Sequence, residues 1–280
     1  MDLHFRAFSF VDRIHSIEAG GRISGHYLIP GALSGFSNSL VAEAVGQLAA
    51  WSSMAALDFT HRPVAGLAGR VELLSSVMPG QTLQLAAEVE SVDEEAVSYG
   101  GTATVNGQPV LKLHHCVGPM MDLKEFDDPE QVRQRFNRLN GEGVAPGAFG
   151  GVPELSLNLQ PVTATDSIQA AIEVPQAGDF FADHFPRKPV LPGTLLTHAN
   201  LQLAATLMEQ VAPSAANARW LPTTIADVKL RAFISPGETL ELEARTKETS
   251  TDSATVAMQI RSAGRRIGSC RVGLTREGTA

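Results

Sequence analysis

The sequence repeats itself once, and this repeat limits the folds that the chain can adopt. The segment Met78-Pro-Gly-Gln-Thr-Leu-Gln-Leu85 recurs as Ser235-Pro-Gly-Glu-Thr-Leu-Glu-Leu242. In each copy the Pro-Gly pair predicts a tight turn that feeds an alternating strand, because proline presets one central φ angle and glycine supplies the positive one. The period is roughly 155 residues, the size of a domain and far above that of a solenoid unit. The chain is therefore predicted to contain two copies of one domain.

The remaining elements follow the same order in the two halves. Alternation of apolar and polar residues predicts strands at 84–91, 96–106 and 109–117, and again at 239–248, 253–263 and 265–274. Each half also carries a long segment of apolar and small residues that predicts a buried helix. The first covers 37–54 and the second begins at Gly193. Before the first helix, we expect strands over 3–18 and 22–28.

A charged segment and a flexible segment lie between the repeats. A short helix is predicted over 128–139, with Asp128 as its N-cap, Pro129 at its first position and Gly141 at its end. The Gly- and Pro-rich stretch that follows is typical of a linker. We therefore expect an N-terminal unit, a connection and a C-terminal unit, with the bounds 1–120, 121–153 and 154–280.

Composition and charge argue against several classes of protein. Hydrophobic residues make up 44% of the chain, as in a folded soluble protein. The net charge of −8 and the pI of about 5.5 argue against nucleic acid as a partner. No basic-then-apolar segment begins the chain, and no apolar run reaches ~18 residues. We expect a cytoplasmic protein without a membrane span.

The cysteines and paired histidines have ordinary structural explanations. Cys116 and Cys270 stand at equivalent places in the two halves, which predicts buried side chains rather than a disulfide. His114 and His115 lie beside Cys116, but adjacent residues of a strand point to opposite faces. No metal site is expected there.

The most distinctive motif lies before the second helix. In the segment His184-Phe-Pro-Arg-Lys-Pro-Val-Leu-Pro-Gly193, three prolines restrict the backbone around one histidine. Gly193 then opens the apolar helix, whose N-terminus presents free backbone N–H groups and the positive end of the helix dipole. The motif thus delivers an imidazole and donors for an oxyanion side by side.

This motif resembles the 3-hydroxyacyl-(acyl-carrier-protein) dehydratases of fatty-acid synthesis, whose hotdog fold wraps an antiparallel sheet round one long helix. For a duplicated chain, the resemblance implies an α+β fold with two tandem hotdog units. The family pattern also places an acid on the helix, fourteen residues after the histidine, and a glutamine four residues later. Those positions hold His198 and Gln202 here, so the second half lacks the acid.

The first half carries what the second half lacks. Glu43 and Gln47 stand four residues apart on one face of the first predicted helix, and they resemble the family's Glu-Ala-x-x-Gln pattern. The loop around His26, in contrast, is shortened. Family sites take the histidine from one protomer and the acid from the other. The resemblance therefore implies a site that combines His184 with Glu43, and a second pair, His26 with His198, that has no carboxylate.

The resemblance also implies a role for each site residue. His184 would remove the α-proton of a 3-hydroxyacyl thioester, and the Gly193 amide would bind the carbonyl oxygen. Protonated Glu43 would donate to the leaving hydroxide, with Gln47 orienting it. No metal or organic cofactor is required, because the pantetheine belongs to the substrate.

Partners and two other functions stay open. Arg187 and Lys188 are either solvated loop charges or a docking patch for an acidic acyl carrier protein. The substrate could also be a CoA thioester, and the chains could form homo-oligomers. A hotdog thioesterase, which attacks with water, is one alternative function. A non-catalytic protein that binds an acyl carrier is the other.

Overall fold

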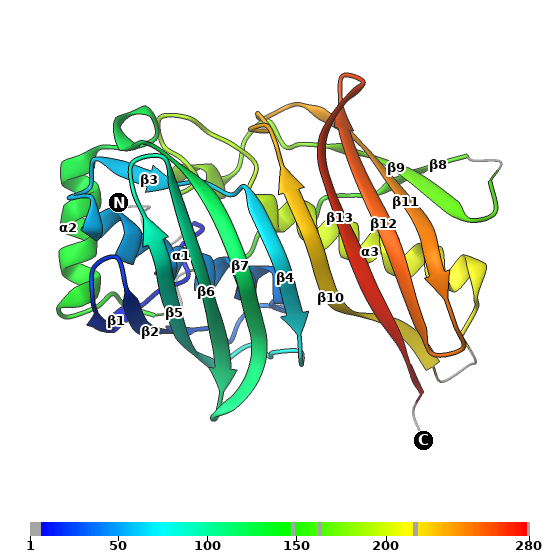
Figure 1. Ribbon diagram of the computed structural model, residues 1–280, viewed down its shortest axis with the longest axis horizontal. Coiled ribbons are helices and arrows are strands. Elements are labelled where there is room, and N and C mark those ends of the chain that lie inside the picture. The colour runs from blue at the N-terminus through cyan, green and yellow to red at the C-terminus, as the bar shows by residue number, and fades with distance from the viewer. Residues whose placement is uncertain (1–6, 147–148, 162–163, 215–217, 279–280) are drawn as a thin grey trace.

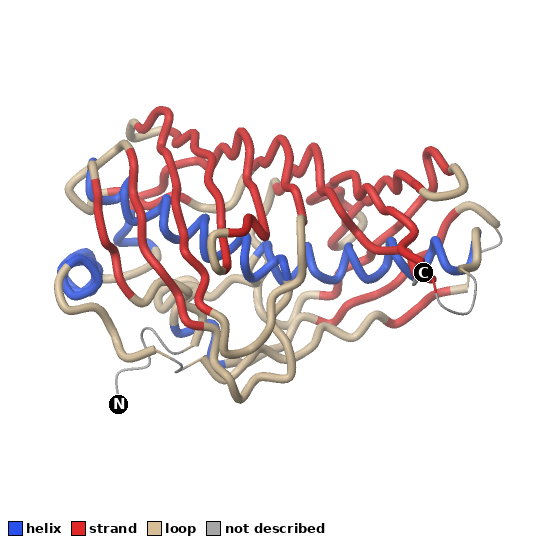
Figure 2. The backbone as a smooth tube through the Cα atoms, turned by 90° about the horizontal axis from the view of Figure 1, so that it is seen from below, coloured by secondary structure: helices blue, strands red, loops and turns tan. Residues whose placement is uncertain are grey.

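One continuous antiparallel sheet of 13 strands runs through the molecule (Figure 1). The computed structural model describes residues 7–146, 149–161, 164–214 and 218–278. The two long helices, α1 (Asn38–Ala56) and α3 (Gly193–Val211), lie along the same face of the sheet, as the view in Figure 2 shows. A curled antiparallel sheet over a long helix, present twice, is a double hotdog of the α+β class.

The two halves use their strands in the same order, mirrored about the centre of the sheet. From its outer edge inward, the first half contributes β1 (Arg13–Ile17), β2 (Arg22–Leu28), β5 (Thr82–Val92), β6 (Ala96–Val105), β7 (Gln108–Asp122) and β4 (Leu67–Leu73). The second half continues outward with β10 (Ala218–Leu230), β13 (Arg265–Gly278), β12 (Ser253–Ser262), β11 (Thr239–Thr249), β9 (Ser167–Glu173) and β8 (Asn158–Gln160). The short strand β3 (His61–Pro63) pairs with β7 off this path. The repeat seen in the sequence is thus a repeat of topology.

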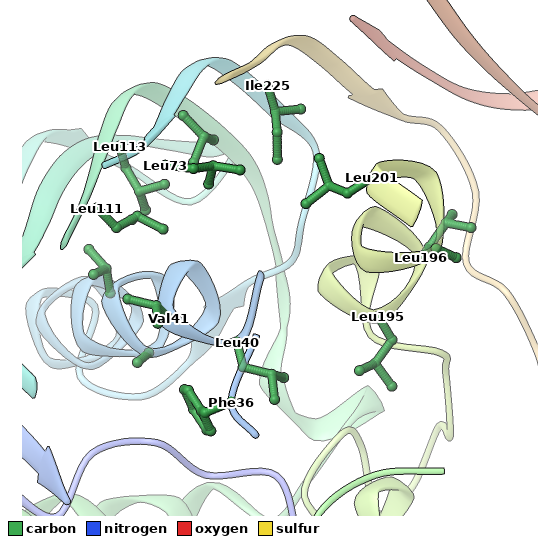
Figure 3. Close-up of a cluster of buried hydrophobic side chains, with 14 of the residues drawn as sticks. Phe36, Leu40, Val41, Leu73, Leu111, Leu113, Leu195, Leu196, Leu201 and Ile225 are labelled. Atoms are coloured by element: carbon green, nitrogen blue, oxygen red, sulfur yellow. The ribbon is translucent and has the colours of Figure 1, made fainter. Parts of the chain in front are cut away.

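The halves join through β4 and β10, which pair antiparallel from Thr224 opposite Glu72 to Lys229 opposite Leu67. Beneath this seam, apolar side chains of both helices and both strands form one core. Figure 3 shows this core, in which Val41 and Leu201 belong to different helices and Ile225 lies on β10. Since burial of apolar surface is the main favourable term in folding, this shared core stabilises both halves together.

The Pro-Gly repeats are turns, as expected. Gly80 and Gly237 have φ angles of 85° and 79°, a region that glycine enters without a steric penalty. The strands that follow them, β5 and β11, alternate between buried and less buried residues, so one face of each packs on the central helices. The strands predicted from alternation are confirmed to within a few residues.

The expected first strand over 3–18 is wrong for much of its length. The strand β1 covers only Arg13–Ile17, residues 7–12 form no regular strand, and residues 3–6 lie outside the described part of the chain. Side chains bind the backbone of this segment in place of a neighbouring strand. The N–H of Phe8 donates to the Asp183 carboxylate and that of Phe10 to the Gln47 amide oxygen. The apolar pattern therefore reflects burial under the helices and not pairing in the sheet.

The connection between the halves contains the 3-10 turn η1 (Leu123–Glu125) and the helix α2 (Pro129–Asn140). The Asp128 carboxylate accepts hydrogen bonds from the N–H groups of Glu130 and Gln131, so the predicted N-cap is confirmed. Since β7 runs to Asp122, the strand continues past the expected end of the first unit, and the division into units remains a proposal. Among the described residues, no helix is both long and apolar enough to cross a membrane.

Candidate active site

A cavity of about 250 Å³ lies between the two halves. One wall is a face of α1 that includes Glu43, Gln47 and Trp51. The start of α3 and the turn η2 (Asp179–Ala182) with the loop after it close another side, and they bring Gly193 and His184 to the cavity. The cavity therefore holds groups that the sequence separates by about half of the chain.

Glu43 is fixed by one donor from each half of the chain. Its Oε1 accepts a hydrogen bond of 3.0 Å from the Gln47 amide, one helical turn further along α1. Its Oε2 accepts a hydrogen bond of 2.7 Å from the Thr194 hydroxyl at the start of α3. Gln47 is itself held, since its amide oxygen accepts from the N–H of Phe10 and its amide nitrogen also donates to the carbonyl of Phe8. The carboxylate therefore has a defined position in the cavity.

His184 is oriented by its own loop. Its Nδ1 lies 3.1 Å from the carbonyl oxygen of Val190, so this nitrogen carries the proton and donates it. The Nε2 is then the basic nitrogen of the neutral ring. Burial lowers the pKa of His184 below its usual 6.5, and the Glu43 carboxylate nearby partly offsets this effect. The imidazole is thus held in the form that can accept a proton.

Gly193 is the first residue of α3, and the side chain of Leu230 packs closely against it. A Cβ at this residue would lie 2.6 Å from the Leu230 Cδ1 atom. Pro192 precedes the helix and provides no side-chain cap, so the first N–H groups of α3 are open to a ligand in the cavity. Together with the positive end of the helix dipole, they can bind an oxygen that gains negative charge.

The second pair of histidines is not brought together, which corrects the expected arrangement. His26 lies within β2, not in a loop, and its Nδ1 is 2.8 Å from the Nε2 of His15 on β1. His198 lies on α3, where burial lowers its pKa and Glu154 partly offsets this effect. His26 thus lies on the strand that corresponds to β9, whereas His184 lies in the longer loop between β9 and α3.

Arg187 and Lys188 are ion-paired with the segment between the halves. Arg187 contacts the Asp128 carboxylate at 3.0 Å, and Lys188 contacts that of Glu125 at 3.3 Å. The Arg187 N–H also donates to the carbonyl of Phe126. These contacts hold the histidine loop against η1 and α2. Carrier docking by the two cations remains a proposal.

Two cavity residues carry functional groups that no sequence pattern had singled out. The Thr194 hydroxyl donates a hydrogen bond to Glu43 across the two halves. In the sequence, only its position next to Gly193 indicated that Thr194 could belong to the site. Arg62 lies on β3, and no motif in the sequence indicated a role for it in the site. Only the fold brings it to the cavity. Elsewhere, Cys116 and Cys270 are free and buried. No cluster of His, Cys, Asp or Glu suited to a metal ion occurs in the described ranges.

The fold defines the class of the protein, which is that of double-hotdog proteins. A putative oleoyl thioesterase from Lactobacillus plantarum superposes over 92% of this chain and 98% of its own, with a TM-score of 0.60 and 12% sequence identity. The tesB protein MAP1729c of Mycobacterium avium subs paratuberculosis superposes over 94% and 96%, with a TM-score of 0.56 and 8% identity. At such low identity these likenesses establish the fold alone.

Sequence comparison finds dehydratases similar to part of the chain. Residues 160–267 match the model of the ApeI-like family, described as ApeI dehydratase. The 3-hydroxyacyl-[acyl-carrier-protein] dehydratase FabZ of Rickettsia rickettsii is 39% identical over 64 residues, or 23% of this chain and 44% of the relative. The Rickettsia felis protein of the same description is 38% identical over the same length and shares. The chain thus aligns with less than half the length of these relatives. Over these segments, the chain is similar to the 3-hydroxyacyl-[acyl-carrier-protein] dehydratases.

Proposed function

We propose that the protein removes water from 3-hydroxyacyl thioesters to give trans-2-enoyl thioesters, with one composite site per chain. The substrate would be bound to an acyl carrier protein or to CoA, in fatty-acid, polyketide or related lipid biosynthesis. The observation that carries this proposal is the orientation of His184. Its Nδ1–H is held by the Val190 carbonyl, so its Nε2 is free to act as a base in the cavity that also holds Glu43 and Gly193.

The first chemical step is removal of the α-proton by His184. A thioester α-proton is weakly acidic, so its removal needs both a base and stabilisation of the enolate oxygen. The backbone N–H at Gly193 and the α3 dipole would supply that stabilisation. Because burial lowers the His184 pKa, the neutral imidazole is the dominant form at neutral pH.

The second step is loss of the 3-hydroxyl group, which leaves as water when Glu43 donates a proton to it. The Thr194 hydroxyl donates to Glu43 in the structure, and a hydroxyl can also accept. It could therefore reverse its direction when Glu43 carries a proton. Gln47 keeps the carboxyl in place during both stages.

One observation favours a thioesterase as the second candidate. Both oxygens of Glu43 accept hydrogen bonds, from Gln47 and Thr194, as an ionised carboxylate does. An ionised Glu43 could orient a water molecule toward the thioester carbonyl. In that case the products would be a free acid and a thiol.

A product assay separates the two candidates. Purified protein is incubated with (3R)-3-hydroxyacyl pantetheine thioesters of several chain lengths, and the products are identified by mass. We expect a loss of one water from the intact thioester, with the reverse hydration on adding the enoyl thioester. Release of the free acid without enoyl product would replace the proposal by the thioesterase.

A further inference from the structure

Arg62 places a cation beside the catalytic candidates. Its guanidinium carbon lies 3.6 Å from the centre of the Phe185 ring, and that ring stacks on His184 with 4.1 Å between the ring centres. Both separations are measured to the centre of the Phe185 ring. The distance from the Arg62 guanidinium carbon to the centre of the imidazole therefore cannot exceed their sum. Both residues line the same cavity.

Within the described part of the chain, the carboxylates of Asp127 and Glu43 lie near this guanidinium, but neither forms a close ion pair with it. The Arg62 Nε is shielded from solvent and has no hydrogen-bond partner. Burial lowers the pKa of Arg62 to about 9, and the nearby Asp127 and Glu43 carboxylates only partly offset this effect. A cation removed from water without a partner is costly, so the site would gain from an anion.

The carboxylates that line the cavity are already engaged elsewhere. Glu43 binds the two donors described above. Asp127 forms an ion pair with Arg135 and also accepts from the N–H of residue 128. Asp183 accepts hydrogen bonds from the backbone of residues 7 and 8. None of these hydrogen bonds involves Arg62, so its guanidinium remains able to form a hydrogen-bonded ion pair with an anionic ligand in the cavity.

We propose that Arg62 binds a carboxylate carried by the acyl group of the substrate. This rests on the proposed function and deepens it, because it assigns the site to thioesters with a second, anionic end. The short path from Arg62 through Phe185 to His184 decides between two sources of negative charge. A phosphate of the carrier arm is separated from the thioester by the whole pantetheine chain. A carboxylate a few bonds from the α-carbon can reach Arg62 while His184 contacts the α-proton.

A binding experiment without turnover tests this assignment. The ligands are three unreactive six-carbon acyl thioesters: acyl pantetheine with a terminal carboxylate, acyl pantetheine with a terminal methyl group, and the methyl-ended acyl group on 4′-phosphopantetheine. Calorimetry gives the Kd of each. Since a hydrogen-bonded pair of charges is worth about tenfold to a hundredfold in affinity, we expect the carboxylate ligand to bind at least about tenfold more tightly than the methyl ligand.

Two variants assign that preference to Arg62. Arg62→Met keeps much of the side chain's length and removes the charge, and it should bind the first two ligands equally. Arg133→Met is the matched control, because Arg133 also stacks on a phenylalanine, Phe59 at 4.9 Å, but does not line the cavity. This control should keep the full preference.

Several outcomes would overturn the proposal. Equal affinity of the wild type for the carboxylate and methyl ligands would do so even if Arg62→Met did not fold. A preference for the phosphorylated ligand alone would assign the cation to the carrier arm. An equal loss of affinity for all three ligands in Arg62→Met would mean that Arg62 supports the loop through Phe185. Because the assay needs no catalysis, a protein without dehydratase activity could still pass it, and the two proposals can fail separately.

Discussion

His184 and Glu43 are supplied by different halves, and each has a defined role in the proposed reaction. We predict that His184→Ala and Glu43→Gln each lower kcat by about a hundredfold or more, as expected when a general acid or base is removed. His26→Ala and His198→Ala should have much smaller effects, because these residues do not meet in the structure. Steady-state kinetics on one 3-hydroxyacyl thioester checks all four variants. Loss of activity only in the His26 and His198 variants would contradict the assigned site.

The pH dependence of the reaction should reflect the buried imidazole. A base is active when deprotonated, and burial lowers the pKa of His184 below 6.5. The decline of activity on the acid side should therefore have its midpoint below pH 6.5. The measurement is the pH profile of kcat/KM for the wild type. A decline that begins well above pH 6.5 would mean that another group limits the reaction.

A substitution at Gly193 tests the oxyanion site, because it changes the packing at the start of α3 without removing a polar side chain. The Cβ of Gly193→Ala would lie 2.6 Å from the Leu230 Cδ1 atom, so either the Leu230 side chain or the start of α3 would have to shift. If the helix start shifts, kcat should fall by about tenfold or more, since an oxyanion donor acts only from its correct position; if Leu230 shifts instead, kcat should be unchanged. The double variant with Leu230→Ala removes the obstructing atom and should recover part of the activity. No recovery, with folding intact by circular dichroism, would point away from a steric cause.

At the scale of elements, η1 and α2 support the histidine loop through two ion pairs, Arg187 with Asp128 and Lys188 with Glu125. These pairs are partly exposed, so each contributes about 1 kcal/mol or less to stability. We predict that Lys188→Glu lowers turnover of carrier-bound and pantetheine substrates alike, because the new charge repels Glu125. Adding Glu125→Lys restores the pair and should restore both activities. If only the carrier-bound substrate were affected, and the swap did not restore it, Lys188 would serve in docking.

The elements themselves were largely predictable from the sequence because their signals are local. Alternation gave the strands that follow Gly80 and Gly237, and Asp128 with Pro129 gave the start of α2. The segment 7–12 was not predictable, because Asp183 and Gln47 bind its backbone across long sequence separations. An apolar pattern alone does not distinguish such a segment from a strand.

The same distinction applies to the site. Glu43, Gln47, His184 and Gly193 stand in short motifs that resemble those of a family, so the sequence alone is enough to propose them. Thr194 and Arg62 stand in no such motif, and their relevance arises only when the two halves pack together. The ion pairs of Arg187 and Lys188 with residues about 60 positions away were hidden for the same reason.

At the scale of the whole molecule, the sheet passes without interruption from β4 to β10, and one core lies beneath both halves. Figure 3 shows that residues of α1 and α3 meet within this core. The proposed composite site would therefore require both halves of the assembled chain. The Thr194 hydroxyl on Glu43 is a direct contact across this junction.

The covalent connection through α2 has a consequence for how the activity responds to dilution. In an enzyme made of two separate subunits, a site shared between them is lost when the concentration falls below the dissociation constant. Here the two parts are tethered, so each sees the other at a fixed, high effective concentration. Specific activity should therefore stay constant when the protein is diluted from micromolar to picomolar. A protease cut within residues 141–146, where the chain follows α2, should leave a nicked protein whose activity becomes sensitive to dilution.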